Sequence, residues 1–336
     1  IDKSTGYHSR SILNVPLKNH EDDIIGVMQL LNSIDPETGE VQFFSTEMQE
    51  LVESLASQGA VALTNKRLVL ELRNLFESFI KLIATAIDKK SPYTGGHCER
   101  VPVIAMLLAD AVGKTTNGKY KNFSMTEDER YELYIASWLH DCGKVATPPH
   151  IVDKATKLET ITDRIHTVDT RFEVKKRDLE ISMLKKQIQL MKNGSADDAM
   201  DKIKLEYEKV LDQLNDDREF IHKSNRGGEF MAEDERKRVA NIGNYKWISN
   251  GDEIPFLDKE EVRNLQIPKG TLLPEERKII NDHIVITIEM LEKLPYPKKL
   301  KNVPEFAGGH HEKLDGTGYP KGLKDEEMSV QAKMMA

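Results

Sequence analysis

The sequence predicts a mostly α-helical protein that begins with a small α/β part, and three observations carry this prediction. Residues 11–32 contain two short segments with strand patterns. After residue 45, long stretches place apolar residues at helical or heptad spacing. Residues 155–242 are dense in charge and carry two apolar stripes on either side of a Gly/Ser/Asp turn at 191–198, which is typical of an antiparallel helical hairpin.

Composition narrows the class of protein. The chain has 336 residues, of which 39% are hydrophobic and 31% charged, and the excess of charge fits a long solvated hairpin. A net charge of −8 argues against a nucleic-acid polymer as partner. No apolar run approaches the roughly 18 residues of a membrane span. The two cysteines, Cys98 and Cys142, exclude a disulfide scaffold or thiolate zinc site and indicate a reducing, cytoplasmic setting.

The N-terminal segment predicts a β-hairpin. Residues 11–18 alternate, with Leu13, Val15 and Leu17 on one face, and residues 24–32 form a second, more apolar strand. Because the chain opens at Ile1 within this pattern, we expect it to be part of a longer protein.

A long helix is expected from Ser45, with Ser45 or Thr46 as its N-cap, and it ends near 91–97. Its second half carries an apolar seam at 4-3-4-3-4 spacing, made by Leu68, Leu72, Leu75, Phe79, Leu82 and Ala86. The seam fits pairing with the same helix of a second copy in a homodimer. It fits equally an amphipathic helix packed on its own domain.

Two further helices are predicted, and they and the hairpin carry defined apolar faces. Residues 126–144 predict a helix with a capping box from Thr126 to Glu129. Its inner face carries Leu133, Ala136 and His140. Residues 274–294 predict one helix with Pro274 at its first position and an inner face of Ile279, Ile280, His283, Thr287 and Met290. The hairpin stripes consist of Ile161, Ile165, Val168, Phe172 and Leu179, and of Ile203, Tyr207, Val210, Leu214 and Ile221.

Five of the ten histidines lie at helix ends or on apolar faces, where an unpaired imidazole is costly to bury: His97, His140, His283, His310 and His311. Each alone is more often a satisfied core histidine than a ligand. Together with Asp141 they exceed what one metal needs, and they suit two divalent ions such as iron, manganese, nickel or zinc. Two such ions bridged by a hydroxide usually attack phosphoesters.

The ordered motifs resemble a known family. His140-Asp141-Cys-Gly-Lys144 resembles the signature of the HD phosphohydrolase superfamily, and HHEKLDGTGYP at 310–320 is similar to the defining motif of its HD-GYP branch. HCERV at 97–101 matches the His-x-x-Arg helix start of that branch, and the His283 helix matches its next histidine. The hairpin and the start of the long helix resemble the C-terminal half of a GAF sensor domain. The implied fold is an all-helical HD-type bundle with an inserted helical hairpin, preceded by a partial α/β GAF domain.

The resemblance implies hydrolysis of cyclic di-GMP to the linear dinucleotide or to GMP by a hydroxide that bridges two divalent metal ions, under control of the GAF part. Asp141 and Lys144 are the expected catalytic residues, and Lys144, Arg100 and Tyr319 are expected to face the substrate. The alternative for Lys144 and for Arg100 is a structural ion pair, and it has more weight for Arg100 than for Lys144. The Gly318-Tyr319-Pro320 loop would shape the rim of the site or meet a protein partner. The implied metal ligands are His97, His140, Asp141, His283, His310 and His311.

Three departures from the family pattern shape these expectations. A further metal-binding aspartate and the residues that contact guanine would fall past Ala336. Members with three metals carry a glutamate four residues before the first histidine, where this chain has Tyr93, so we expect two metals. The interval from 144 to 283 is long, so we interpret the hairpin as an insertion that docks a partner or lengthens a dimer contact.

The expected parts of the chain are 1–65 (GAF), 66–90 (linking helix), 91–154 and 243–336 (HD-GYP), and 155–242 (hairpin).

Two other functions fit the same residues. One is a receptor that binds metal and cyclic di-GMP with negligible turnover and signals to a partner. The other is an HD enzyme that acts on a different cyclic dinucleotide or on a nucleotide.

Overall fold

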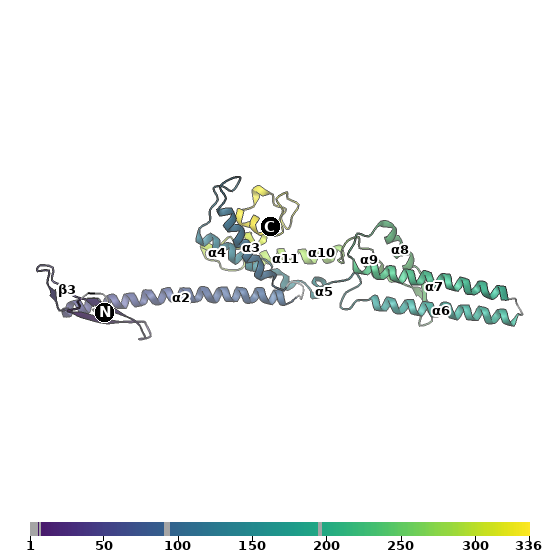
Figure 1. Cartoon of the computed structure of the whole chain (residues 1–336), viewed down its shortest axis with the longest axis horizontal. Helices are drawn as coiled ribbons and strands as arrows, with labels where there is room; N and C mark the ends of the chain where they lie inside the picture. Colours follow the sequence, from purple (N-terminus) through teal and green to yellow (C-terminus); the bar gives the residue numbers. More distant parts are fainter. Residues whose placement is uncertain (1–5, 7, 91–94, 194–196) are drawn as a thin grey trace. The chain divides into compact units, whose positions relative to one another are not determined.

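The computed structural model describes residues 6, 8–90, 95–193 and 197–336 (Figure 1). The chain divides into two compact units, Ile1–Lys81 and Leu82–Ala336. Tyr93 and the centre of the predicted hairpin turn, residues 194–196, lie outside the described residues. Among the described residues, no helix combines the length and apolar character that crossing a membrane requires.

The first unit contains the predicted β-hairpin. Strands β1 (Ile12–Lys18) and β2 (Ile24–Leu31) pair antiparallel, and β3 (Ser33–Ile34) pairs with β4 (Val41–Gln42). The predicted alternation of β1 is confirmed, because Val15 is buried against Val52 and Ala56 while Leu13 and Leu17 pack beside it.

Helix α2 (Thr46–Lys90) is 45 residues long. The Ser45 hydroxyl accepts a hydrogen bond from the Met48 N–H at 3.2 Å, which confirms the predicted cap. The predicted seam is exposed: Leu72 is 66% and Leu75 53% accessible. The buried apolar residues in the second half of the helix are others, namely Ile80, Ala84 and Ile87.

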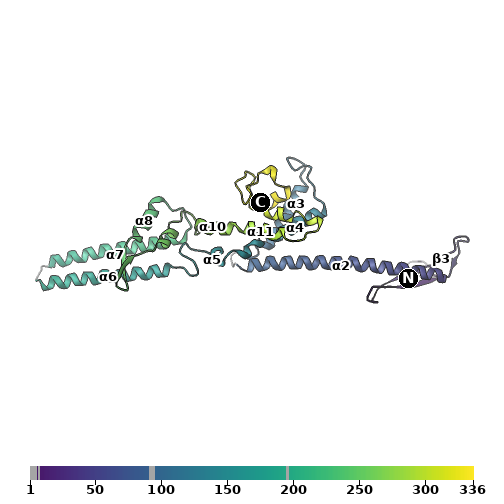
Figure 2. The same cartoon turned by 180° about the vertical axis from the view of Figure 1, so that it is seen from behind.

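The second unit contains a bundle of short helices. Its segments are α3 (His97–Gly113), α4 (Glu127–Leu139), η1 (Cys142–Ala146), α5 (Pro149–Val152), α10 (Pro274–Asn281), α11 (His283–Glu292), η2 (Lys298–Leu300), α12 (Val303–Gly308), η3 (Asp325–Glu327) and α13 (Val330–Met335). Helix α3 packs on α4, α4 on α12, and α13 on both α3 and α12, so the C-terminal segment lies beside α3 (Figure 2). The capping box of Thr126 and Glu129 is confirmed, as is burial of Leu133, Ala136 and His140.

One helix prediction is wrong. Residues 274–294 form two helices that meet at Asp282 rather than one. Helix α10 packs on α5, whereas α11 packs on η1 and α12. Ile279 and Met290, predicted to face inward, are each 40% exposed, while His283 and Thr287 are buried.

The predicted hairpin is formed by α6 (Ile165–Lys192) and α7 (Asp197–Arg226), which lie side by side in both views (Figures 1 and 2). The stripes are buried only near the base, and Ile161 and Val210 are 90% and 44% exposed, contrary to prediction. Helix α8 (Glu233–Gly243), strands β5 (Lys246–Ser249) and β6 (Asp252–Pro255), and helix α9 (Lys259–Leu265) follow. They share one core with the base, which contains Phe172, Leu214, Ile221, Val239, Phe256 and Leu265. This core contains residues from both sides of position 242, the expected boundary between the hairpin and the second HD-GYP part. That boundary stays a prediction.

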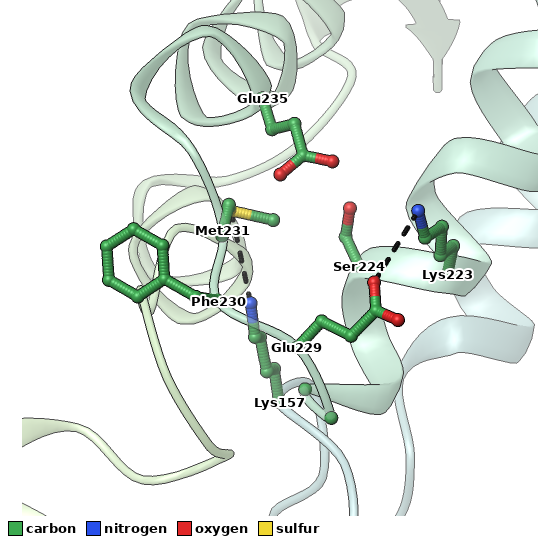
Figure 3. A pocket seen from close by; sticks show the side chains of 9 residues that line it. Lys157, Lys223, Ser224, Glu229, Phe230, Met231 and Glu235 are labelled. Atoms are coloured by element: carbon green, nitrogen blue, oxygen red, sulfur yellow. Dashed lines mark hydrogen bonds and ion pairs between the residues drawn. The ribbon is translucent and has the colours of Figure 1, made fainter.

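A buried lysine lies at the base of the hairpin. Lys157 donates hydrogen bonds to the main-chain carbonyls of Leu265 at 3.0 Å and Ile267 at 2.7 Å. Burial lowers the pKa of Lys157 to about 8. With Glu229 and Glu235 it lines a small cavity of about 70 Å³ (Figure 3). This cavity shares no lining residue with the histidine cluster described next.

Candidate metal centre

The structure brings all six predicted metal ligands together in two groups. One group is His97, His140 and Asp141, and the other is His283, His310 and His311; within each, the ligand atoms lie within 4.8 Å of one another. The residues come from the start of α3, the end of α4, the start of α11 and the loop after α12. Their role as ligands stays a prediction.

A glycine permits the close approach of η1 and α11. A Cβ on Gly143 would lie 2.0 Å from the carbonyl oxygen of His283, so no larger residue fits without movement. The Thr287 hydroxyl accepts a hydrogen bond from the Gly143 N–H at 2.9 Å and donates one to the His140 carbonyl at 3.2 Å. The HDxGK turn is thereby fastened to the helix that presents His283.

Three of the imidazoles make the same local hydrogen bond, from Nδ1 to the main-chain carbonyl three residues earlier. The Nδ1–O distances are 2.8 Å for His140, 2.6 Å for His283 and 2.7 Å for His310. Because a carbonyl only accepts, Nδ1 carries the proton and Nε2 presents its lone pair. This arrangement is typical of histidines that bind metals.

Asp141 lies between the two groups and is 2% exposed. Its Oδ2 is 3.2 Å from Nε2 of His140 and 3.4 Å from Nε2 of His97. Its Oδ1 is 3.4 Å from Nε2 of His283 and 3.8 Å from Nε2 of His310.

Nitrogen lone pairs and carboxylate oxygens that lie this close together favour a cation between them. The Nε2 atoms of His97 and His140 are 3.2 Å apart, and those of His283 and His310 are 3.5 Å apart. At His310 this cation is not a second proton, because burial lowers the pKa of His310 to about 3. The buried Oδ1 of Asp141 accepts no hydrogen bond from the described residues. Lone pairs converging on an orphaned carboxylate oxygen fit divalent metal ions.

Lys144, Tyr319 and Arg100, the three residues predicted to face the substrate, differ in how they contact the cluster. Lys144 donates to Oδ2 of Asp141 at 2.7 Å, so its ammonium is the ion-pair partner of that carboxylate. The Tyr319 ring stacks on His311 with centroids 4.7 Å apart, and burial raises the pKa of the Tyr319 phenol. Arg100 is exposed, and among the described residues no hydrogen bond or ion pair joins its side chain to the cluster.

Glu312 is a site residue that the sequence reasoning missed. It is 3% exposed, and its carboxylate accepts the N–H groups of Lys321 and Leu323, both at 2.8 Å. A Cβ on Gly318 would lie 2.3 Å from the Lys313 nitrogen, so the loop closes tightly here. Glu312 therefore folds the Gly-Tyr-Pro loop against His311. An acid inside a run so rich in glycine and proline was the available signal.

Comparison with known families agrees with this geometry. Two models described as HD domain match residues 260–336 and 94–217, and a GAF domain model matches residues 2–63. A helical fold with a buried His-Asp pair defines a metal-dependent HD domain. The chain therefore carries HD-domain segments and a GAF part at its N-terminal end, and these matches support an HD-GYP-type protein.

Several relatives are phosphodiesterases by name. The chain is 33% identical over 90 residues to the 3'3'-cGAMP-specific phosphodiesterase 3 of Vibrio cholerae serotype O1, a match that covers 26% of this chain and 19% of that protein. It is 40% identical over 78 residues to a probable cyclic di-GMP phosphodiesterase of the same organism, covering 22% and 18%. It is 39% identical over 67 residues to the cyclic di-GMP phosphodiesterase of Thermotoga maritima, covering 20% and 18%. The chain thus spans about a fifth of the length of these relatives.

Proposed function

We propose that the protein is a metal-dependent phosphodiesterase that hydrolyses cyclic di-GMP. The observation that carries this proposal is the buried Asp141, whose two oxygens face separate groups of histidine nitrogens. A bridging carboxylate between two ligand sets suits a pair of divalent cations, and such pairs suit phosphoester hydrolysis. The names of the relatives support the substrate class.

Each residue has a separate role in this proposal. Bound cations would supply a hydroxide from water and neutralise charge on the phosphate. Oδ2 of Asp141 serves the group with His97 and His140, and Oδ1 serves the group with His283, His310 and His311. Lys144, whose side chain is 26% exposed, holds Asp141 and turns its remaining N–H groups toward an incoming phosphate. Tyr319 fixes the His311 ring by stacking on it.

A second candidate substrate is 3'3'-cGAMP, because three of the relatives are named as phosphodiesterases specific for it. Both substrates present the same phosphodiester to the metal centre, so the histidine cluster does not distinguish them. A hydrolysis panel of both dinucleotides separates the two candidates by their kcat/KM ratio.

Regulation by the GAF part belongs to the same proposal. Helix α2 is continuous from the GAF part to the residues just before α3. In this proposal it pairs with α2 of a second copy, and the hairpin of α6 and α7 or the loop Gly318–Pro320 docks a protein partner.

The test combines metal content with turnover. The protein is loaded with manganese or iron and compared with His310→Ala and His311→Ala variants. His166→Ala is the control, because His166 is exposed on α6 outside the cluster. We expect bound metal and hydrolysis in the wild type and in the control, and loss of both in the cluster variants. Metal binding without hydrolysis of either dinucleotide would favour the receptor function.

A further inference from the structure

The last turn of α2 touches the turn that carries the HD motif. Lys90 donates hydrogen bonds to three main-chain carbonyls, those of Lys144 at 3.0 Å, Val145 at 2.7 Å and Thr147 at 2.6 Å. An ammonium has three N–H groups, so these bonds use its full donor capacity. Two of these acceptors lie in η1, which begins directly after Asp141, and the third is Thr147, the residue that follows η1.

The same turn of α2 also touches the helix that presents His97. Asp88 is 6% exposed, and its Oδ2 accepts the N–H of Cys98 at 3.0 Å. Cys98 follows His97 in the first turn of α3, where main-chain N–H groups lack helical partners and a carboxylate is favoured. Two side chains two residues apart therefore hold the two segments that carry His97, Asp141 and Lys144.

We propose that Lys90 and Asp88 form a clamp that positions the metal centre and transmits the state of α2 to it. Lys144 is the link, because its carbonyl is bound by Lys90 while its ammonium is bound to Oδ2 of Asp141. A shift of the last turn of α2 moves η1 and the shared carboxylate together. Lys90 and Asp88 are positioning residues, since neither belongs to the six clustered side chains. The metal readout of this inference rests on the proposed function.

The neighbouring lysine provides a matched control. Lys89 is exposed, and no hydrogen bond from its side chain to η1 is found among the described residues. Lys90→Met removes the ammonium but keeps most of the side-chain volume, and Lys89→Met makes the same change without touching the clamp. Lys90→Arg is the conservative variant, because a guanidinium also donates several N–H groups to carbonyls.

The experiment measures amide hydrogen exchange of residues 142–147 in the metal-free protein, together with manganese affinity. With Lys90→Met we expect faster exchange at the N–H groups of Lys144 and Thr147, which bond the carbonyls of Asp141 and Lys144. Manganese affinity should fall about 10- to 100-fold, the range typical of outer-shell partners. Lys89→Met should match the wild type, and Lys90→Arg should recover most of the loss. Lys90→Gln is the second variant if Lys90→Met does not fold.

Three outcomes overturn the clamp: unchanged exchange in η1, an equal effect of Lys89→Met, or faster exchange spread evenly over the whole chain. The last would assign Lys90 a purely structural role. If the wild type binds no manganese, the proposed function fails, whereas exchange in η1 still decides the clamp. Asp88→Ala against Asp88→Asn, which keeps an acceptor oxygen, tests the second contact by exchange at the Cys98 N–H.

Discussion

At the scale of single residues, the histidine cluster is prepared for cations by local hydrogen bonds. Because Nδ1 of His140, His283 and His310 is committed to a carbonyl, the neutral tautomer is fixed and Nε2 points into the cluster. A cation therefore meets lone pairs whose orientation is already set, which lowers the ordering cost of binding. Asp141 adds the negative charge that neutral imidazoles lack.

Replacement of Asp141 by Asn is the sharpest test at this scale. Asn keeps the shape of the side chain but removes the charge and places an amide where a lone pair is needed. We expect manganese affinity to fall by more than about 100-fold, beyond the range of outer-shell partners. Titration calorimetry and metal analysis after dialysis measure the loss. Asp128→Asn, at an exposed position paired with Lys299, is the control. Wild-type metal content in the Asp141→Asn variant would contradict the site.

How much of the site the sequence predicts depends on the distance over which each contact acts. The motif residues were found because they lie at helix ends, on apolar helix faces and in ordered motifs, all of which the sequence shows directly. Lys90 was missed because its acceptors lie 54 to 57 positions further along the chain. Glu312 was missed because its carboxylate bonds main-chain N–H groups, which carry no side-chain pattern.

At the scale of elements, capping and periodicity predicted the helices, but they did not predict the interruption at Asp282. The cap at Ser45 and the box at Thr126 are local, and both were predicted correctly. The break at Asp282 has no glycine or proline to mark it, and α10 and α11 pack on different partners. The stripes of the hairpin were predicted, but periodicity does not say how far along its length they are covered.

Gly143→Ala tests the contact between η1 and α11. The new Cβ would lie 2.0 Å from the His283 carbonyl oxygen and 2.6 Å from the Thr287 nitrogen, both main-chain atoms that yield only if α11 moves. We expect the free energy of unfolding to fall by about 1–3 kcal/mol or more, as in other overpacked sites, and manganese affinity to fall with it. Denaturant and thermal unfolding of the metal-free protein measure the first effect.

Gly113→Ala is the matched control, because a Cβ there meets nothing within 4 Å. Equal stability of the two variants would show that η1 and α11 separate easily, and the positioning argument for the HDxGK turn would fail.

At the scale of the whole chain, the mostly helical fold with small sheets was predicted correctly, but the partners of exposed surfaces were not determined by it. The seam of α2 shows why. Heptad spacing says that a helix covers the seam, but it does not say which one. The structure leaves Leu72, Leu75 and Leu82 more than half exposed, and the buried face of α2 is made by other residues. Pairing of α2 with its own copy stays a prediction.

Disulfide trapping tests this pairing. Extending the seam backward places the exposed Val61 and Asn65 in register with Leu68, Leu72 and Leu75. A single Asn in such a seam favours a parallel, in-register pair, because only then does each amide meet its copy.

Leu75→Cys should therefore form an intermolecular disulfide under mild oxidation, detected on non-reducing gels. The chain's own two cysteines are 2% and 4% exposed, so the new thiol is the reactive one. Arg67→Cys, on the polar face, should cross-link far less. Equal cross-linking of both variants, or none, would contradict the parallel pair.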